Sequence, residues 1–83
     1  YAHPAFELRL LGLRTEEAIK TLEKQLDLCT LHNFKTFSVI HGKGEGILQQ
    51  AVQDYLSNCS TVESFAFAPP EDGGSGKTYV KLG

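Results

Sequence analysis

The sequence of 83 residues lacks most of the features that mark a specialised class of protein. No apolar stretch approaches the roughly 20 residues that a membrane-spanning helix requires, and no signal peptide opens the chain. The two cysteines, Cys29 and Cys59, form neither a disulfide scaffold nor a C-x-x-C metal site, so we expect small buried thiols in a reducing, cytoplasmic setting. With 8 Lys and Arg against 10 Asp and Glu, the chain also lacks the basic excess of a stand-alone nucleic-acid-binding protein.

The composition is that of an ordinary globular domain, with 41% hydrophobic and 22% charged residues, 8 Gly and 3 Pro. It excludes a disordered tail, a collagen-like chain and a coiled coil. The length fits one domain with one modest core. We expect a leader over residues 1–5 and a single domain over residues 6–83, and the start at Tyr1 suggests a fragment of a longer protein.

Hydrophobic periodicity predicts the secondary structure. Strands are expected over 6–10, 36–40, 62–68 and 77–82, and amphipathic helices over 15–32 and 46–57. In the first strand Phe6, Leu8 and Leu10 share a face. Thr15 is the expected N-cap of the first helix, and Ile47 opens the apolar stripe of the second.

The order of these elements, βαβαββ, predicts an α/β two-layer sandwich. Strand–helix–strand units favour parallel neighbours with right-handed crossovers, whereas the last two strands, joined by a loop, can pair antiparallel. Two helices do not cover both faces of four strands well. We therefore expect a four-stranded mixed sheet with both helices on one face.

The segment richest in chemistry is His41-Gly42-Lys43-Gly44-Glu45-Gly46, between a strand and a helix. Its glycines permit a sharp turn and a close approach to a ligand, and the helix start offers N–H groups and a positive dipole end to a phosphate. Lys43 adds a charge, and His41 adds a group that titrates near neutral pH. The alternative is a plain turn in which His41 caps the strand end, and the spacing alone does not decide.

Two nucleotide-binding motifs are excluded. A G-x-G-x-x-G fingerprint would need glycine at the position of Ile47. Gly76-Lys77-Thr78 resembles the end of a P-loop, but Glu71 stands at the motif's first glycine and a strand follows instead of a helix. The sequence therefore does not predict an ATPase.

Further cations are expected near the glycine-rich segment. Alternation places Arg9 on the sheet face opposite Leu8 and Leu10. If the first two strands are adjacent and parallel, their carboxyl ends meet at the edge where α/β folds place ligands, and Arg14 and Lys77 are expected to reach it. The alternative is a set of solvated strand charges.

The sequence does not predict a metal site. His3 and His32 show no ligand spacing, and we expect both to be surface histidines. Glu71 and Asp72 are sequence neighbours on a turn-rich loop, which does not suit the paired acids of a two-metal nuclease.

Three stretches together resemble one family, the Smr (small MutS-related) domain. They are HGKGEG at 41–46 with Leu48, FAFAPP at 65–70 with the glycines of 73–76, and Leu8-x-Leu10-x-Gly12. The resemblance covers about residues 6–82. It implies a fold similar to the carboxyl-terminal domain of a bacterial translation initiation factor.

The family occurs at the carboxyl terminus of a bacterial MutS paralogue and in stand-alone proteins. The resemblance implies binding to DNA, branched or duplex, or to RNA or the ribosome, and endonuclease activity in DNA recombination, repair or ribosome rescue. It implies no membrane partner, and it implies a parent protein that is a homodimer with an upstream ATPase. A nuclease of this family could use a divalent cation, Mg²⁺ or Mn²⁺.

The resemblance implies that the family's glycine-loop role carries over to His41, Gly42, Lys43, Gly44 and Gly46. His41 and Lys43 are the expected catalytic residues. The expected nucleic-acid contacts are Arg9, Arg14, Gly42, Lys43, Gly44, Gly46 and Lys77. Two positions depart from the family pattern, because Arg9 replaces an Asp and Leu11 replaces a His or Arg. An arginine can bind phosphate, but it can neither orient a nucleophile nor hold a metal.

Three functions remain open from the sequence: an endonuclease, a nucleic-acid-binding module without cleavage activity, and a protein-interaction domain. The activity of other family members favours an endonuclease, and Arg9 and Leu11 favour a binding module without cleavage activity. The excess of acidic over basic residues favours a protein-interaction domain. A steep salt dependence of affinity would separate the first two from the third, because phosphate binding releases counterions.

Overall fold

Strands and helices lie close to where the periodicity predicts them. The computed structural model describes residues 3–42 and 46–83. Its strands are β1 (Glu7–Arg9), β2 (Thr36–Ile40), β3 (Val62–Phe67) and β4 (Lys77–Leu82), and its helices are α1 (Thr15–Leu31) and α2 (Ile47–Ser57). Two short 3-10 turns, Pro70–Asp72 and Gly74–Gly76, lie between β3 and β4. Neither helix in this described part of the chain has the length and apolarity to cross a membrane.

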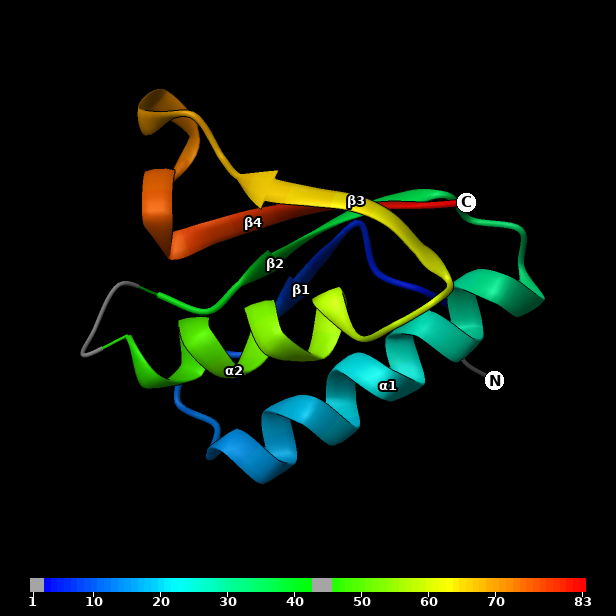
Figure 1. Cartoon of the computed structure of the whole chain (residues 1–83), viewed down its shortest axis with the longest axis horizontal. Coiled ribbons are helices and arrows are strands. Elements are labelled where there is room, and N and C mark those ends of the chain that lie inside the picture. Colours follow the sequence, from blue (N-terminus) through cyan, green and yellow to red (C-terminus); the bar gives the residue numbers. More distant parts are fainter. Residues whose placement is uncertain (1–2, 43–45) are drawn as a thin grey trace.

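The four strands form one mixed sheet in the order β1-β2-β4-β3. β1 runs parallel to β2, and β4 is antiparallel to both of its neighbours. Both helices cover one face of the sheet and leave the other face open (Figure 1), which confirms the predicted two-layer sandwich.

The lateral order corrects one expectation. β1 and β2 are parallel neighbours, as the first strand–helix–strand unit predicts, but β2 and β3 are not neighbours. The chain after β3 turns back, so that β4 inserts between them and hydrogen-bonds to both.

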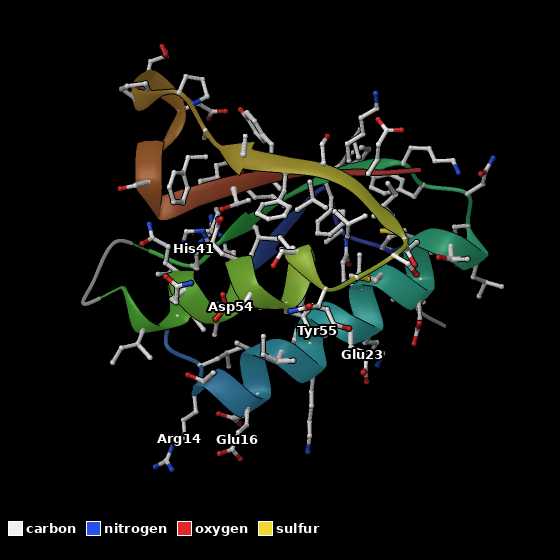
Figure 2. All side chains as sticks on the ribbon, in the orientation of Figure 1. Arg14, Glu16, Glu23, His41, Asp54 and Tyr55 are labelled. Carbon is white, nitrogen blue, oxygen red and sulfur yellow. The ribbon has the colours of Figure 1, made fainter. Side chains whose placement is uncertain are left out.

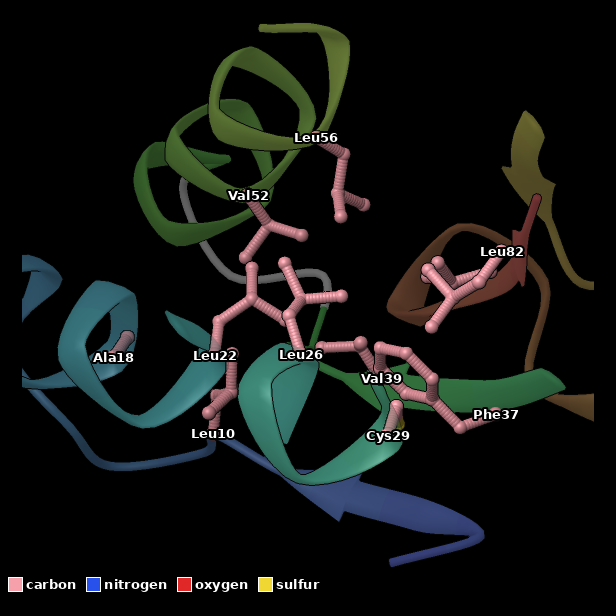
Figure 3. Close-up of a cluster of buried hydrophobic side chains, with 11 residues drawn as sticks. Leu10, Ala18, Leu22, Leu26, Cys29, Phe37, Val39, Val52, Leu56 and Leu82 are labelled. Carbon is pink, nitrogen blue, oxygen red and sulfur yellow. The ribbon is translucent and has the colours of Figure 1, made fainter. Parts of the chain in front are cut away.

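One hydrophobic core fills the space between the sheet and the helices. Alternation in β2 and β4 turns Phe37, Val39, Val80 and Leu82 toward the helices. The remaining core residues are Leu10, Ala18, Leu22, Leu26, Cys29, Val52 and Leu56 (Figure 3). Burial of this apolar surface is the main force that holds the two layers together.

Two predicted details of the sheet and the second helix are corrected. The first strand begins at Glu7, and the Phe6 ring is 78% exposed and packs edge-on against Phe34 at 4.9 Å between centroids. Only the carbonyl of Phe6 is held by the sheet, through a 2.8 Å bond from the Ser38 N–H. Ile47 is 65% exposed, because it lies at the first position of α2, ahead of the buried stripe.

The start of α1 is shifted by one residue. Arg14 is the N-cap and Thr15 is the first helical residue. The Arg14 N–H donates to Oε1 of Glu17 at 3.3 Å. The side chain of Glu17, and not the expected threonine hydroxyl, therefore provides the hydrogen-bond acceptor at the start of α1.

Candidate nucleic-acid interface

The carboxyl ends of β1 and β2 lie side by side at one edge of the sheet. Arg9 is in register with Ile40, and the Leu10 N–H donates to the Ile40 carbonyl at 2.8 Å. Both helices also begin at this edge, on the left in Figure 1. The edge therefore combines strand ends with the positive dipole ends of two helices.

A glycine starts the second helix at this edge. Gly46 is the N-cap of α2 and has a φ of 82°, a left-handed conformation that suits glycine. Its carbonyl accepts the first helical bond, from the Gln50 N–H at 2.9 Å. Lys43, Gly44 and Glu45 lie outside the described residues, so the roles expected of Lys43 and Gly44 stay predictions.

The loop before β4 is hydrogen-bonded to the residues that follow β2. The N–H groups of His41 and Gly42 both donate to the Gly76 carbonyl, at 3.1 and 2.9 Å. The Gln49 side chain donates from Nε2 to the Ser75 carbonyl at 2.7 Å. These bonds fix the end of β2 and the first turn of α2 to one loop.

Gly42 lies directly against Leu11. Gly42 has a φ of 78°, and a Cβ at this position would come within 2.5 Å of Cδ2 of Leu11. Leu11 is nevertheless 54% exposed. The apolar side chain of Leu11, one of the two residues that depart from the family pattern, thus lies against the backbone of Gly42.

His41 points into the protein and is only 4% exposed. Its Nδ1 lies 3.1 Å from the Gly42 carbonyl, and its Nε2 lies 2.7 Å from Oγ1 of Thr78. A carbonyl oxygen only accepts, so Nδ1 carries the proton of the neutral ring and the Thr78 hydroxyl donates to Nε2. Thr78 Oγ1 in turn accepts a bond from Nε2 of Gln53 at 3.4 Å.

This bond chain ties α2, β4 and the end of β2 together. The imidazole lies between the sheet and the start of α2 (Figure 2), with the Phe67 ring 6.4 Å away between centroids. Both ring nitrogens have partners inside the protein. A proton transfer to or from a substrate would therefore require one of these bonds to open.

Lys77 and Arg9 lie on the open face of the sheet, close to the same edge. Lys77 Nζ contacts Oε2 of Glu7 at 3.0 Å and Oδ1 of Asp72 at 3.2 Å. These hydrogen bonds, that to Glu7 first, raise the pKa of Lys77, so its ammonium stays charged but is shared with two carboxylates. Arg9 is exposed and has no ion-pair partner among the described residues, which makes it the more available cation.

Arg14 is not brought together with these groups. It precedes α1 at the same edge, but its side chain points away from the sheet and from His41 (Figure 2). The structure thus gathers Arg9, Gly42, Gly46 and Lys77 near one edge.

The other histidines take no part in a metal cluster. His3 is exposed, whereas His32 is half-buried, so the expected surface position holds only in part for His32. The centroids of the two rings lie 5.1 Å apart, with the rings tilted by 48°. The Nε2 of His32 is buried without a hydrogen-bond partner among the described residues. Within residues 3–42 and 46–83, no three His, Cys, Asp or Glu residues are placed to hold a metal ion.

The sequence analysis missed Thr78, Gln53 and Gln49. A signal was present for Thr78, because alternation in β4 places its hydroxyl in the buried row of Val80 and Leu82. A buried hydroxyl needs a partner, and the nearest polar residue at the strand edge is His41. No comparable signal marks Gln49 or Gln53, because the sequence pattern places both at polar positions of the amphipathic helix.

The family model described as "Smr domain" matches residues 8–83. This match shows that the chain belongs to the Smr domain family.

Curated proteins that are similar to this chain are much longer than it. It is 48% identical over 80 residues to "Endonuclease MutS2" of Bacillus cytotoxicus, covering 96% of this chain and 10% of that protein. It is 46% identical over 81 residues to "Endonuclease MutS2" of Geobacillus kaustophilus, with 98% and 10% covered. The chain therefore spans about a tenth of the length of these relatives.

Two solved structures share the fold. The crystal structure of the Smr domain of Thermus thermophilus MutS2 superposes with a TM-score of 0.91 at 39% identity, covering 95% of this chain and 99% of that one. The crystal structure of YdaL, a stand-alone small MutS-related protein from Escherichia coli, gives a TM-score of 0.86 at 28% identity, with 98% and 67% covered. The fold thus occurs both as a part of MutS2 and in a stand-alone protein.

Proposed function

We propose that this domain binds the phosphate backbone of a nucleic acid at the edge where β1 and β2 end. The observation that carries the proposal is the convergence at this edge of the ends of β1 and β2, the start of α2 with its N-cap Gly46, and the exposed Arg9. Backbone N–H groups and an arginine fork are the usual protein partners of phosphate. Such contacts position a nucleic acid without reading its sequence.

The charge distribution supports a local contact. The chain as a whole has a net charge of −2, and α1 carries four carboxylates, at Glu16, Glu17, Glu23 and Asp27, against two lysines. The outer surface of α1 therefore repels phosphate. The strand-end edge is left as the favourable approach.

Binding of labelled DNA and RNA to the 83-residue chain, followed by fluorescence anisotropy over a salt series, tests the proposal. Affinity should fall steeply with salt, and Arg9→Ala should weaken binding and reduce the slope of log K against log salt by about one unit. Lys20→Ala removes one cation from the exposed surface of α1 and is the matched control. Equal effects of the two variants, or an affinity independent of salt, would contradict the proposal.

Endonuclease activity is the second candidate function. Relatives named endonuclease favour it, as does the presence of a histidine, His41, at the end of β2 beside the proposed phosphate site. Two features favour binding without cleavage. His41 is buried with both ring nitrogens in hydrogen bonds, and position 9 is an arginine instead of an acidic residue. We therefore place binding first.

Cleavage assays on single-stranded, duplex and branched DNA and on RNA separate the two functions. They are run with Mg²⁺ or Mn²⁺ and with chelator, beside His41→Ala and Arg9→Asp. Cleavage that disappears in a folded His41→Ala variant supports the nuclease. Cleavage gained only in Arg9→Asp indicates a binding module that lost its chemistry at this position.

In a protein ten times longer, the domain would serve as a nucleic-acid-anchoring module. We propose that the ligand of this module is DNA or ribosomal RNA. We also propose that the longer parent protein is a homodimer and carries an ATPase domain. The same binding assay, with DNA and RNA of matched length, distinguishes the two nucleic acids.

A further inference from the structure

The open face of the sheet has an ordered arrangement of side chains that the phosphate site does not use. Strand register places Thr36, Lys81 and Ser64 in one row across β2, β4 and β3, and Ser38, Tyr79 and Ala66 in the next. Tyr79 lies on a central strand with small residues on both sides and is 42% exposed. An aromatic residue therefore lies in the middle of the open face of the sheet.

A hollow of about 440 Å³ lies beside this tyrosine. It exists because Ser38, Ser64 and Ala66 fill little space between the larger side chains of Phe6 and Tyr79. A volume of this size is in the range of small-molecule sites. One planar ring system fits such a space better than a bulky folded surface.

Cations flank Tyr79 along its own strand. Lys77 and Lys81 lie two residues before and after it on the same face, and Lys77 Nζ is 5.5 Å from the centroid of the Tyr79 ring. Among the described residues this face carries three cations, Arg9, Lys77 and Lys81. Lys77 is paired with Glu7 and Asp72, and Lys81 is paired with Glu63, so charge on this face is balanced and, in this part of the chain, Arg9 is the cation without an ion-pair partner. The outer surface of α1, with four carboxylates against two lysines, carries an excess of negative charge.

We propose that Tyr79 is a stacking platform for an unpaired base of a single-stranded nucleic acid. Stacking on an aromatic ring, with cations for the neighbouring phosphates, is how sheet surfaces hold single strands without strong sequence preference. The hydroxyls of Thr36 and Ser64 make no hydrogen bond within the described residues, and they are placed at the hollow to meet the edge of the base. A duplex cannot use this platform, because its base faces are already stacked.

This inference rests on the proposed function and extends it. Arg9 and Lys77 lie at the border between the phosphate-binding edge and the open face. A strand whose backbone is held at the edge can thus continue onto the sheet and present its next base to Tyr79. The substrate class this implies is single-stranded DNA or RNA, or a junction between duplex and single strand.

The test compares Tyr79→Ala and Tyr79→Phe with the parent chain. The probes are a short labelled single strand, an abasic strand of the same length, and a duplex, all at one salt concentration. Tyr79→Ala should lose between about fivefold and a hundredfold in affinity for the single strand, the range expected for one stacked base, and little for the abasic strand or the duplex. Tyr79→Phe keeps the ring and should bind as the parent does.

Two further variants control for charge and folding. Lys81→Ala should weaken binding of the single strand more than Lys24→Ala, which removes an exposed lysine from α1. Thermal unfolding of each variant, followed by circular dichroism, shows that the fold is retained, as expected for an exposed position. A variant that does not fold is replaced by Tyr79→Thr, which keeps the preference for a strand.

The outcomes separate this inference from the proposed function. Salt-sensitive binding that Arg9→Ala weakens and Tyr79→Ala leaves unchanged overturns the platform and leaves the phosphate edge standing. Equal losses for all three probes in Tyr79→Ala also overturn the platform. Binding of no nucleic acid by the parent chain overturns both, and a dimer that Tyr79→Ala dissociates would assign the face to a second copy of the chain.

Discussion

The two faces of the four-stranded sheet carry different kinds of residue. The helix-covered face holds Phe37, Val39 and Val80 in the core, and its polar exceptions, His41 and Thr78, bond to each other. The open face holds charged and exposed residues, with Tyr79 at its centre. The covered face and the hydrogen bonds among His41, Thr78 and Gln53 determine stability, whereas the open face and the strand-end edge are available for a ligand.

The largest expected effect is on the covered face. Leu22→Ala removes a side chain that is 0% exposed between α1 and the sheet and should lower the free energy of unfolding by about 2–5 kcal/mol. Leu31→Ala, on the same helix but 77% exposed, should change it by no more than about 0.5 kcal/mol. Urea unfolding followed by circular dichroism measures both. Similar losses for the two variants would break the contrast between buried and exposed positions.

The next effect concerns the polar exception on the covered face. Thr78→Val leaves His41 Nε2 without its donor in a buried site and should lower the free energy of unfolding by about 1–3 kcal/mol. Thr78→Ser restores the hydroxyl and should recover much of the loss. The ¹⁵N chemical shifts of the imidazole report the tautomer, which should be Nδ1–H in the parent chain. An Nε2–H tautomer in the parent chain would show that the bond chain is assigned in the wrong direction.

Alkaline pH should affect the covered face next. Burial raises the pKa of the Cys29 thiol above its ordinary value of 9.0, and burial likewise raises the pKa of Tyr55. The unfolded chain therefore loses these protons first as pH rises, so the free energy of unfolding should fall above about pH 9. Cys29→Ala should show a shallower fall of the free energy of unfolding than the parent chain above about pH 9. Parallel curves for the parent chain and Cys29→Ala would contradict the assignment.

The smallest effect on stability is expected on the open face. Lys81 Nζ lies 3.2 Å from Oε2 of Glu63, but the two side chains are 60% and 53% exposed. Glu63→Ala should therefore change the free energy of unfolding by no more than about 1 kcal/mol. It should, however, strengthen nucleic-acid binding, because it releases Lys81. Weaker nucleic-acid binding in this variant, measured by fluorescence anisotropy, would contradict the assignment of the open face to the ligand.

Much of the fold was predictable because the spacing of apolar residues within each strand and helix indicates which face is buried. The expected strands 36–40 and 77–82 match β2 and β4 to the residue, and the expected helix 15–32 differs from α1 by one. What periodicity does not contain is the lateral order of strands. β4 enters the sheet between β2 and β3 through contacts that are distant in sequence, and no local pattern encodes that choice.

The candidate site was predictable in position but not in orientation. The sequence places His41 at the end of a strand, and parallel pairing brings it beside the end of β1. Which way its ring turns depends on Thr78, 37 residues later in the chain. In the same way, the charge of Lys77 could be counted from the sequence, but its sharing with Glu7, 70 residues away, could not.

A titration of the ¹⁵N-labelled chain with a short single strand, followed by amide chemical shifts, tests the central claim most directly. We predict that shifts concentrate at the ends of β1 and β2, at the start of α2 and along β4 around Tyr79, and that they weaken as salt is added. The outer surface of α1 should stay unchanged. Shifts confined to that helix surface, or none at any concentration of DNA or RNA, would contradict the assignment of a nucleic-acid interface to the strand-end edge.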